Sequence, residues 1–179
     1  MLENFRLNVG KKYARIRFRR KTEPVVRFTD ILSRSRRALV IFPESGLDGD
    51  STQLVLKYLS RRFSSGSLLL LIRDDVANTL TTSSMVKTVT YSREEINAWF
   101  LPRASLLRKL KTSTFDVVFD LNMALALPSA FICRETNALL RIGFAKESGD
   151  EFYNLQVRTT SSSNLPNAYR TLLKCLEMF

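Results

Sequence analysis

The chain has 179 residues, of which 45% are hydrophobic and 25% are charged, with 6 glycines and 5 prolines. This composition is typical of one globular domain of ordinary size, and it excludes a disordered, collagenous or disulfide-scaffolded chain. The sequence has no histidine and 2 cysteines, which excludes histidine-dependent catalytic triads and an ordinary zinc site.

The formal net charge of +11 is concentrated at the N-terminus. Residues 1–37 hold 12 basic and 3 acidic residues, a net of +9, so the remainder of the chain carries only +2. We therefore expect a basic N-terminal arm over 1–37 and a single, nearly neutral domain over 38–179. We expect few core residues in the arm, because little core periodicity is visible there.

The predicted elements alternate between short apolar runs and stretches of helical periodicity. Strands are predicted at 38–42, 68–72, 85–91, 115–121, 139–144 and 152–157. Helices are predicted over 54–63, from Pro102 through Leu110, around Pro128 to near Arg134, and over 164–178. A further helix is predicted from Ser92 and carries Ile96, Trp99 and Phe100. Trp99 and Phe100 are expected in the core, with stacking on a ligand as the alternative.

This alternation predicts an α/β class: a doubly wound, mainly parallel, Rossmann-like sheet with helices on both faces. The strands at 38–42 and 115–121 should lie side by side in the centre, with the strand at 68–72 next to the first. Apolar runs such as Leu68–Ile72 are far shorter than the roughly 20 residues that cross a bilayer, and residues 1–21 have no apolar signal-peptide core. A cytoplasmic protein is expected, with Cys133 and Cys175 as buried thiols.

In sheets of this class ligands bind beyond the carboxyl ends of the strands, which directs attention to the turn 43–50 and to the residues after Asp120. The turn has neither the glycine spacing of a dinucleotide loop nor the lysine of a P-loop, and no cofactor or metal is expected. Asp50 is either a helix N-cap or a general base, and Glu44 and Asp48 are alternative bases. The expected ligand contacts are Glu44, Ser45, Gly49, Ser51 and Asn122.

Asp120 closes the strongest predicted strand and is expected to cap the next turn, whereas Asp116 should face solvent near the start of that strand. The two carboxylates would lie about 13 Å apart along a strand, which is too far for a catalytic pair.

The order of three motifs resembles the acceptor-side domain of the lipopolysaccharide heptosyltransferases, which are glycosyltransferases of the B-type fold. The motifs are the first strand with its turn at 38–50, the strand Phe115–Asn122 and the Leu-Arg-Ile-Gly-Phe strand at 140–144; the resemblance covers about residues 38–150. It implies that Asp50, preceded by Gly49, occupies the place of the catalytic base. The chain ends at Phe179, where the nucleotide-sugar half of those enzymes would begin, so we expect no autonomous transferase activity.

The arm places seven cations among Tyr13, Ile16 and Phe18: Lys11, Lys12, Arg15, Arg17, Arg19, Arg20 and Lys21. A solvated tail, an anionic membrane surface and nucleic acid are open alternatives for this segment. The expected function is a glycosyltransferase-like binding or accessory module. The alternatives are a nucleic-acid-associated protein and a glycosyltransferase that works with a donor domain on another chain; a homo-oligomer also stays open.

Overall fold

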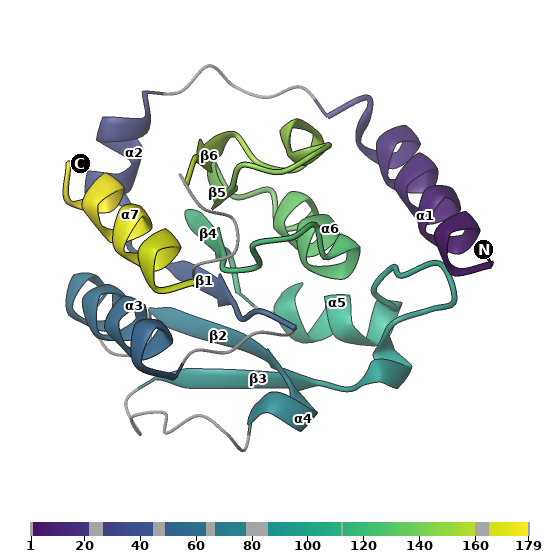
Figure 1. Cartoon of the computed structure of the whole chain (residues 1–179), viewed down its shortest axis with the longest axis horizontal. Coiled ribbons are helices and arrows are strands. Elements are labelled where there is room, and N and C mark those ends of the chain that lie inside the picture. The colour runs from purple at the N-terminus through teal and green to yellow at the C-terminus, as the bar shows by residue number, and fades with distance from the viewer. Residues whose placement is uncertain are drawn as a thin grey trace.

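The computed structural model describes residues 2–21, 27–44, 49–63, 67–77, 86–111, 113–159 and 165–178, and within these ranges six strands form one sheet (Figure 1). The strands are β1 (Ala38–Ile41), β2 (Leu68–Arg73), β3 (Lys87–Tyr91), β4 (Val117–Asp120), β5 (Leu140–Phe144) and β6 (Leu155–Val157). Their order is β3-β2-β1-β4-β5-β6, and every neighbouring pair is parallel. The doubly wound α/β class and the central pairing of β1 with β4 are thereby confirmed.

The helices alternate with the strands along the chain. They are α1 (Leu2–Phe18), α2 (Phe28–Arg34), α3 (Gly49–Arg62), α4 (Asp74–Ala77), α5 (Ala104–Lys111), α6 (Leu127–Glu135) and α7 (Leu165–Glu177), with short 3-10 turns η1 (Arg93–Glu95) and η2 (Gly149–Glu151). The predicted helices near 54–63, 102–110, 128–134 and 164–178 are therefore confirmed within a few residues at each end.

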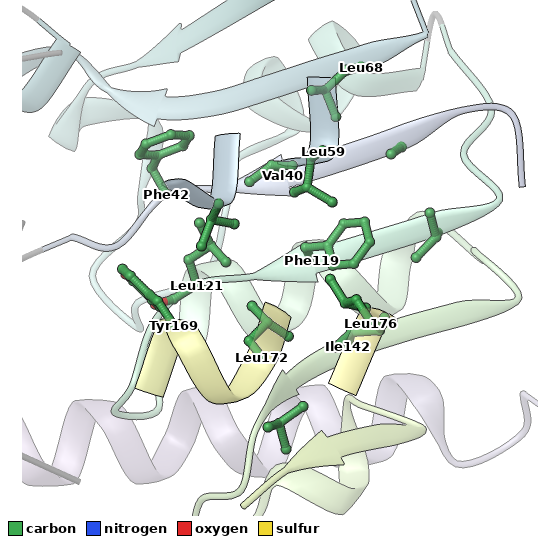
Figure 2. Packing of buried hydrophobic residues seen from close by; sticks show 14 of the residues in the cluster. Val40, Phe42, Leu59, Leu68, Phe119, Leu121, Ile142, Tyr169, Leu172 and Leu176 are labelled. Atoms are coloured by element: carbon green, nitrogen blue, oxygen red, sulfur yellow. The ribbon is translucent and has the colours of Figure 1, made fainter. Parts of the chain in front are cut away.

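Side chains of successive strand residues point to opposite faces, so one sheet supplies two cores. In β1, Val40 joins the cluster covered by α2, α3 and α7, whereas Leu39 and Ile41 join the cluster covered by α1, α5 and α6. Figure 2 shows the first cluster, with Tyr169 and Leu172 of α7 facing the strands. Burial on both faces explains why the strand sequences are continuous apolar runs.

The basic arm contains a helix, α1, that packs against α6. Ala14 and Phe18 are buried in the second core cluster, and the Phe18 ring lies 4.9 Å from that of Phe131. At Gly10 a Cβ would lie 2.1 Å from the carbonyl oxygen of Trp99, so only glycine permits this close approach. The expectation that the arm supplies few core residues is therefore wrong for this face of α1. Whether residues 38–179 form a domain by themselves stays a prediction.

The predicted helix from Ser92 is wrong beyond its first turn. The capping box between Ser92 and Glu95 is present, but it opens only η1, and the chain is extended at Ile96. The Asn97 side-chain oxygen accepts hydrogen bonds from the backbone N–H groups of Trp99 and Leu101, which favours a turn over a helix. Trp99 is 41% exposed, so its predicted place in the core is also wrong.

Cys133 of α6 is fully buried, and Cys175 of α7 is half-buried. Among the described residues, no helix combines the length and apolar character needed to cross a membrane.

Candidate functional site

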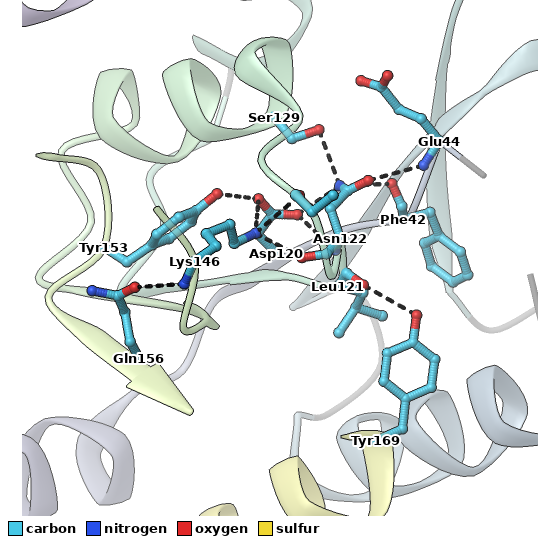
Figure 3. Close-up of polar contacts among 11 residues, drawn as sticks. Phe42, Glu44, Asp120, Leu121, Asn122, Ser129, Lys146, Tyr153, Gln156 and Tyr169 are labelled. Carbon is cyan, nitrogen blue, oxygen red and sulfur yellow. Dashed lines mark hydrogen bonds and ion pairs between the residues drawn. The ribbon is translucent and has the colours of Figure 1, made fainter. Parts of the chain in front are cut away.

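Polar side chains gather at the carboxyl edge of the sheet, where β1, β4 and β5 end (Figure 3). Asp120 is the last residue of β4 and pairs in register with Ile41 of β1. Its neighbours in space come from the segments after β1, β4 and β5, because parallel strands end at the same edge. We refer to Asp120, Asn122, Ser129, Lys146 and Tyr153 as the Asp120 cluster.

Both carboxylate oxygens of Asp120 are used inside the protein. Oδ1 accepts hydrogen bonds from the backbone N–H and the side-chain amide of Asn122 at 3.0 and 2.7 Å. Oδ2 accepts a hydrogen bond from the hydroxyl of Tyr153 and lies 3.7 Å from Nζ of Lys146. The Asp120 side chain is fully buried, so these partners take the place of water around its charge.

Asn122 connects this carboxylate to two further elements. Its side-chain oxygen accepts the backbone N–H of Glu44 at 3.0 Å, which fixes the chain just after β1. Its amide nitrogen lies 3.2 Å from the hydroxyl oxygen of Ser129 on α6. Asn122 therefore holds the end of β1, the end of β4 and the start of α6 together.

Lys146 and Tyr153 complete the Asp120 cluster from the β5 side. Lys146 is nearly fully buried, donates to the backbone oxygen of Asn122 at 2.6 Å and lies 4.8 Å from the centre of the Tyr153 ring. Burial raises the pKa of Tyr153 well above its usual value, which keeps the hydroxyl protonated as a donor to Asp120. A Cβ at position 143 would lie 2.8 Å from this ring, so Gly143 makes room for Tyr153.

The second part of this edge follows β1, β2 and β3. Glu44 lies just after β1, and its Oε1 atom has no hydrogen-bond partner among the described residues. Burial raises the pKa of the Glu44 carboxyl, and the positive charge of Arg73 at the end of β2 opposes this shift. Arg73 and Arg93 both pair with Asp75. Glu44 therefore has one buried oxygen left without a hydrogen bond among the described residues, whereas both oxygens of Asp120 have internal partners.

Asp50 lies in the first turn of α3 with an exposed side chain, while the next two residues, Ser51 and Thr52, are buried. Because α3 begins at Gly49, Asp50 is its second residue and not its N-cap, so the N-cap prediction is wrong. The positive end of the helix dipole stabilises the solvated carboxylate of Asp50. No structural observation assigns Asp50 a catalytic role, and that role stays a prediction. We refer to Glu44 together with Asp50 as the acidic turn.

The structure brings together only some of the predicted site residues. Glu44 and Asn122 are joined by a hydrogen bond, and Gly49 and Ser51 lie in the first turn of α3. Ser45 and Asp48 fall outside the described residues. Asp116 accepts the backbone N–H groups of Arg36 and Arg37 at the opposite edge, which separates it from Asp120 as expected.

Three members of the Asp120 cluster were not singled out from the sequence: Ser129, Lys146 and Tyr153. The position of Lys146, two residues beyond the carboxyl end of β5, was a usable signal, because ligand sites and polar clusters concentrate at such ends. Tyr153 had no comparable signal, since it reaches Asp120 only after the turn η2 reverses the chain.

The cations of the arm divide into two groups. Arg15 pairs with Glu151, and Arg17 and Lys21 pair with Glu135. Lys12, Arg19 and Arg20 are exposed, Lys11 is half-buried, and among the described residues none of these four has an ion pair. Some cations of the arm therefore form ion pairs with the domain, and others face solvent.

Comparison with known proteins finds a structural likeness at low sequence identity. No protein-family model matches the chain, and no curated protein matches it. The crystal structure of the glycosyl transferase family 9 protein from Veillonella parvula DSM 2008 aligns with 80% of this chain at a TM-score of 0.59 and 14% identity. The chain spans 42% of the length of that protein. The resemblance carried by the sequence motifs is thus supported at the level of the fold.

Proposed function

We propose that this chain is a glycosyltransferase-like module that binds an acceptor or assists another protein and transfers no sugar by itself. The observation that carries the proposal is the state of the cations at the carboxyl edge. Lys146 is held by Asn122 and Asp120, and Arg73 and Arg93 face Asp75. Lys146 and Arg73 would each have to break a close contact to meet the diphosphate of a nucleotide sugar, and Arg93, with an exposed side chain, already faces a carboxylate at 3.7 Å.

The helix N-termini of this edge support the same conclusion. A diphosphate is bound by free backbone N–H groups at a helix N-terminus or by convergent basic side chains. The first turn of α3 carries the carboxylate of Asp50, which repels a phosphate. The acidic turn suits a hydroxyl-rich ligand better, because the buried and unpartnered oxygen of Glu44 would gain a hydrogen bond from a sugar hydroxyl that reached it.

The competing function is a glycosyltransferase that uses a donor domain on another chain, with Asp50 as its base. The exposed carboxylate of Asp50 at the start of α3 favours it, because an accessible carboxylate can take a proton from an acceptor hydroxyl. Such an enzyme still needs a second unit to position the donor, and positioning supplies roughly 7–11 kcal/mol of the barrier reduction in well-oriented reactions.

Titration of the full chain with ADP- and UDP-sugars in a calorimeter tests the proposal. We expect no binding at micromolar concentrations and no transfer to a sugar acceptor. Neutral hexoses or heptoses at millimolar concentration should shift the amide resonances of Glu44 and Ser51 in NMR spectra, and Glu44→Gln should weaken that response. Tight nucleotide-sugar binding, or sugar transfer that is lost in Asp50→Asn, would overturn the proposal in favour of an autonomous enzyme.

A further inference from the structure

We propose that the outward face of α1 docks on a bilayer surface that contains anionic lipids. The docking face consists of Leu2, Phe5, Lys12 and Ile16 of α1 together with Arg19 and Arg20 in the turn that follows it. This inference does not depend on the proposed function, because it concerns another part of the molecule.

The two faces of α1 are occupied very differently. Gly10, Ala14 and Phe18 recur every four residues, and all three are buried against the domain. Phe5, Lys12 and Ile16 recur at spacings of seven and four residues and lie on the opposite side of the helix. Leu2 is 72% exposed, Phe5 60% and Ile16 65%, so water covers most of this apolar surface.

The domain holds this face in place. On the inner side Phe18 packs against Phe131, Arg15 pairs with Glu151, and Arg17 pairs with Glu135. Figure 1 shows α1 on the outside of the molecule, away from α3 and α7. Because the helix is already formed and fastened, lipid binding does not have to order it, which lowers the cost of association.

The composition of the docking face argues for lipid rather than for the other occupants. Aliphatic and aromatic side chains beside lysine and arginine, as on this face, suit the boundary between lipid headgroups and acyl chains. Nucleic acid would use the three cations but would leave Leu2 and Ile16 without apolar partners. A second copy of the chain would place the same cations against each other, and the net charge of +11 adds to this repulsion.

Flotation of the full chain with vesicles tests this inference. One set of vesicles contains phosphatidylcholine alone, and the other contains phosphatidylcholine with about 30% phosphatidylglycerol. We expect binding to the anionic vesicles only. Each basic residue near an anionic surface contributes about five-fold in affinity, so Lys12→Gln/Arg19→Gln/Arg20→Gln should weaken binding by on the order of a hundred-fold. Phe5→Ser/Ile16→Ser should weaken it at least ten-fold, at an unchanged thermal midpoint.

Matched variants on the other side of the sheet serve as controls. Lys57→Gln/Arg61→Gln/Arg170→Gln removes three exposed cations from α3 and α7, and Leu54→Ser/Met178→Ser removes two exposed apolar side chains. Both controls should bind vesicles like the parent chain. The inference fails if the parent does not bind anionic vesicles, or if the controls lose as much affinity as the docking-face variants. It also fails if the parent binds an RNA or DNA oligonucleotide in preference to the vesicles. Conversion of a dimer to a monomer by Phe5→Ser/Ile16→Ser would overturn it as well.

Discussion

The Asp120 cluster and the acidic turn lie at the same edge of the sheet, and they differ in how their carboxylate oxygens are used. Asp120 is fully buried, and both of its oxygens have partners within the protein. Glu44 keeps one oxygen without a partner among the described residues, and the side chain of Asp50 is exposed. A buried and fully paired carboxylate holds segments together, whereas an incompletely paired one keeps the capacity to accept a further hydrogen bond.

The difference follows from what each carboxylate can recruit. Asp120 is the last residue of a central strand, so the segments after both neighbouring strands can reach it. Glu44 lies just after β1, and Asp50 lies in the first turn of α3. Position in the fold, rather than residue type, therefore separates the fully paired carboxylate of Asp120 from the incompletely paired one of Glu44 and the exposed one of Asp50.

Asp120→Ala should cause the largest change. The substitution leaves Lys146 buried without its counter-charge, and it removes the acceptor of the Tyr153 hydroxyl and of the Asn122 amide. Removing one partner of a buried ion pair typically costs about 3–5 kcal/mol, so the free energy of unfolding should fall by that amount. Urea unfolding followed by circular dichroism measures it. A loss below about 1 kcal/mol would show that the Asp120 cluster is not what holds this edge together.

Gly143→Ala should have an intermediate effect on the same cluster. The added Cβ displaces the Tyr153 ring, and overpacking of this kind costs about 1–3 kcal/mol. Tyr153→Phe removes the hydroxyl bond to Asp120, and it should cost less in the Gly143→Ala background than in the parent, because the ring has already moved. A double-mutant cycle measures this coupling. Additive effects would mean that Gly143 does not set the position of Tyr153.

The sheet could be predicted from the sequence, because burial on both faces makes parallel strands such as Leu68–Ile72 apolar throughout, and right-handed crossovers then restrict the strand order. Two local features were missed for definite reasons. Asn97 accepts two backbone N–H groups and so ends the helix that the capping box at Ser92 predicts. The inner face of α1 is marked only by Gly10, Ala14 and Phe18, a faint pattern among many cations.

The candidate site was predictable only in part. Asn122 follows the end of a central strand, and that position alone identifies it as a candidate site residue. The partnership of Asp120 with Tyr153 joins residues 33 positions apart, and it depends on the turn η2 and on the missing side chain at Gly143. Local sequence patterns contain no information on such a contact, because three separate elements must already be in place before it forms.

Glu44→Gln should raise stability slightly at neutral pH. Burial raises the pKa of Glu44 in the folded protein above its ordinary value of 4.5, so the folded state binds this proton more tightly than the unfolded state does. Stability contributed by the protonated group is fully present below pH 4.5 and is lost as the pH rises through the folded pKa. The advantage of glutamine should therefore appear at pH 7 and vanish below pH 4.5. Thermal midpoints of both proteins across this range measure it, and an advantage that grows towards acid pH would contradict the assignment.

Asp50→Asn should produce the smallest change of this series. The Asp50 side chain is exposed, and its contribution to the start of α3 through the helix dipole is no more than about 1 kcal/mol. Asparagine removes only the charge that interacts with the helix dipole, so the unfolding free energy should fall by no more than that limit. Urea unfolding at neutral pH measures it. A loss as large as that of Asp120→Ala would place Asp50 in a closed network like that of the Asp120 cluster, and the contrast between the two acidic regions would then no longer hold.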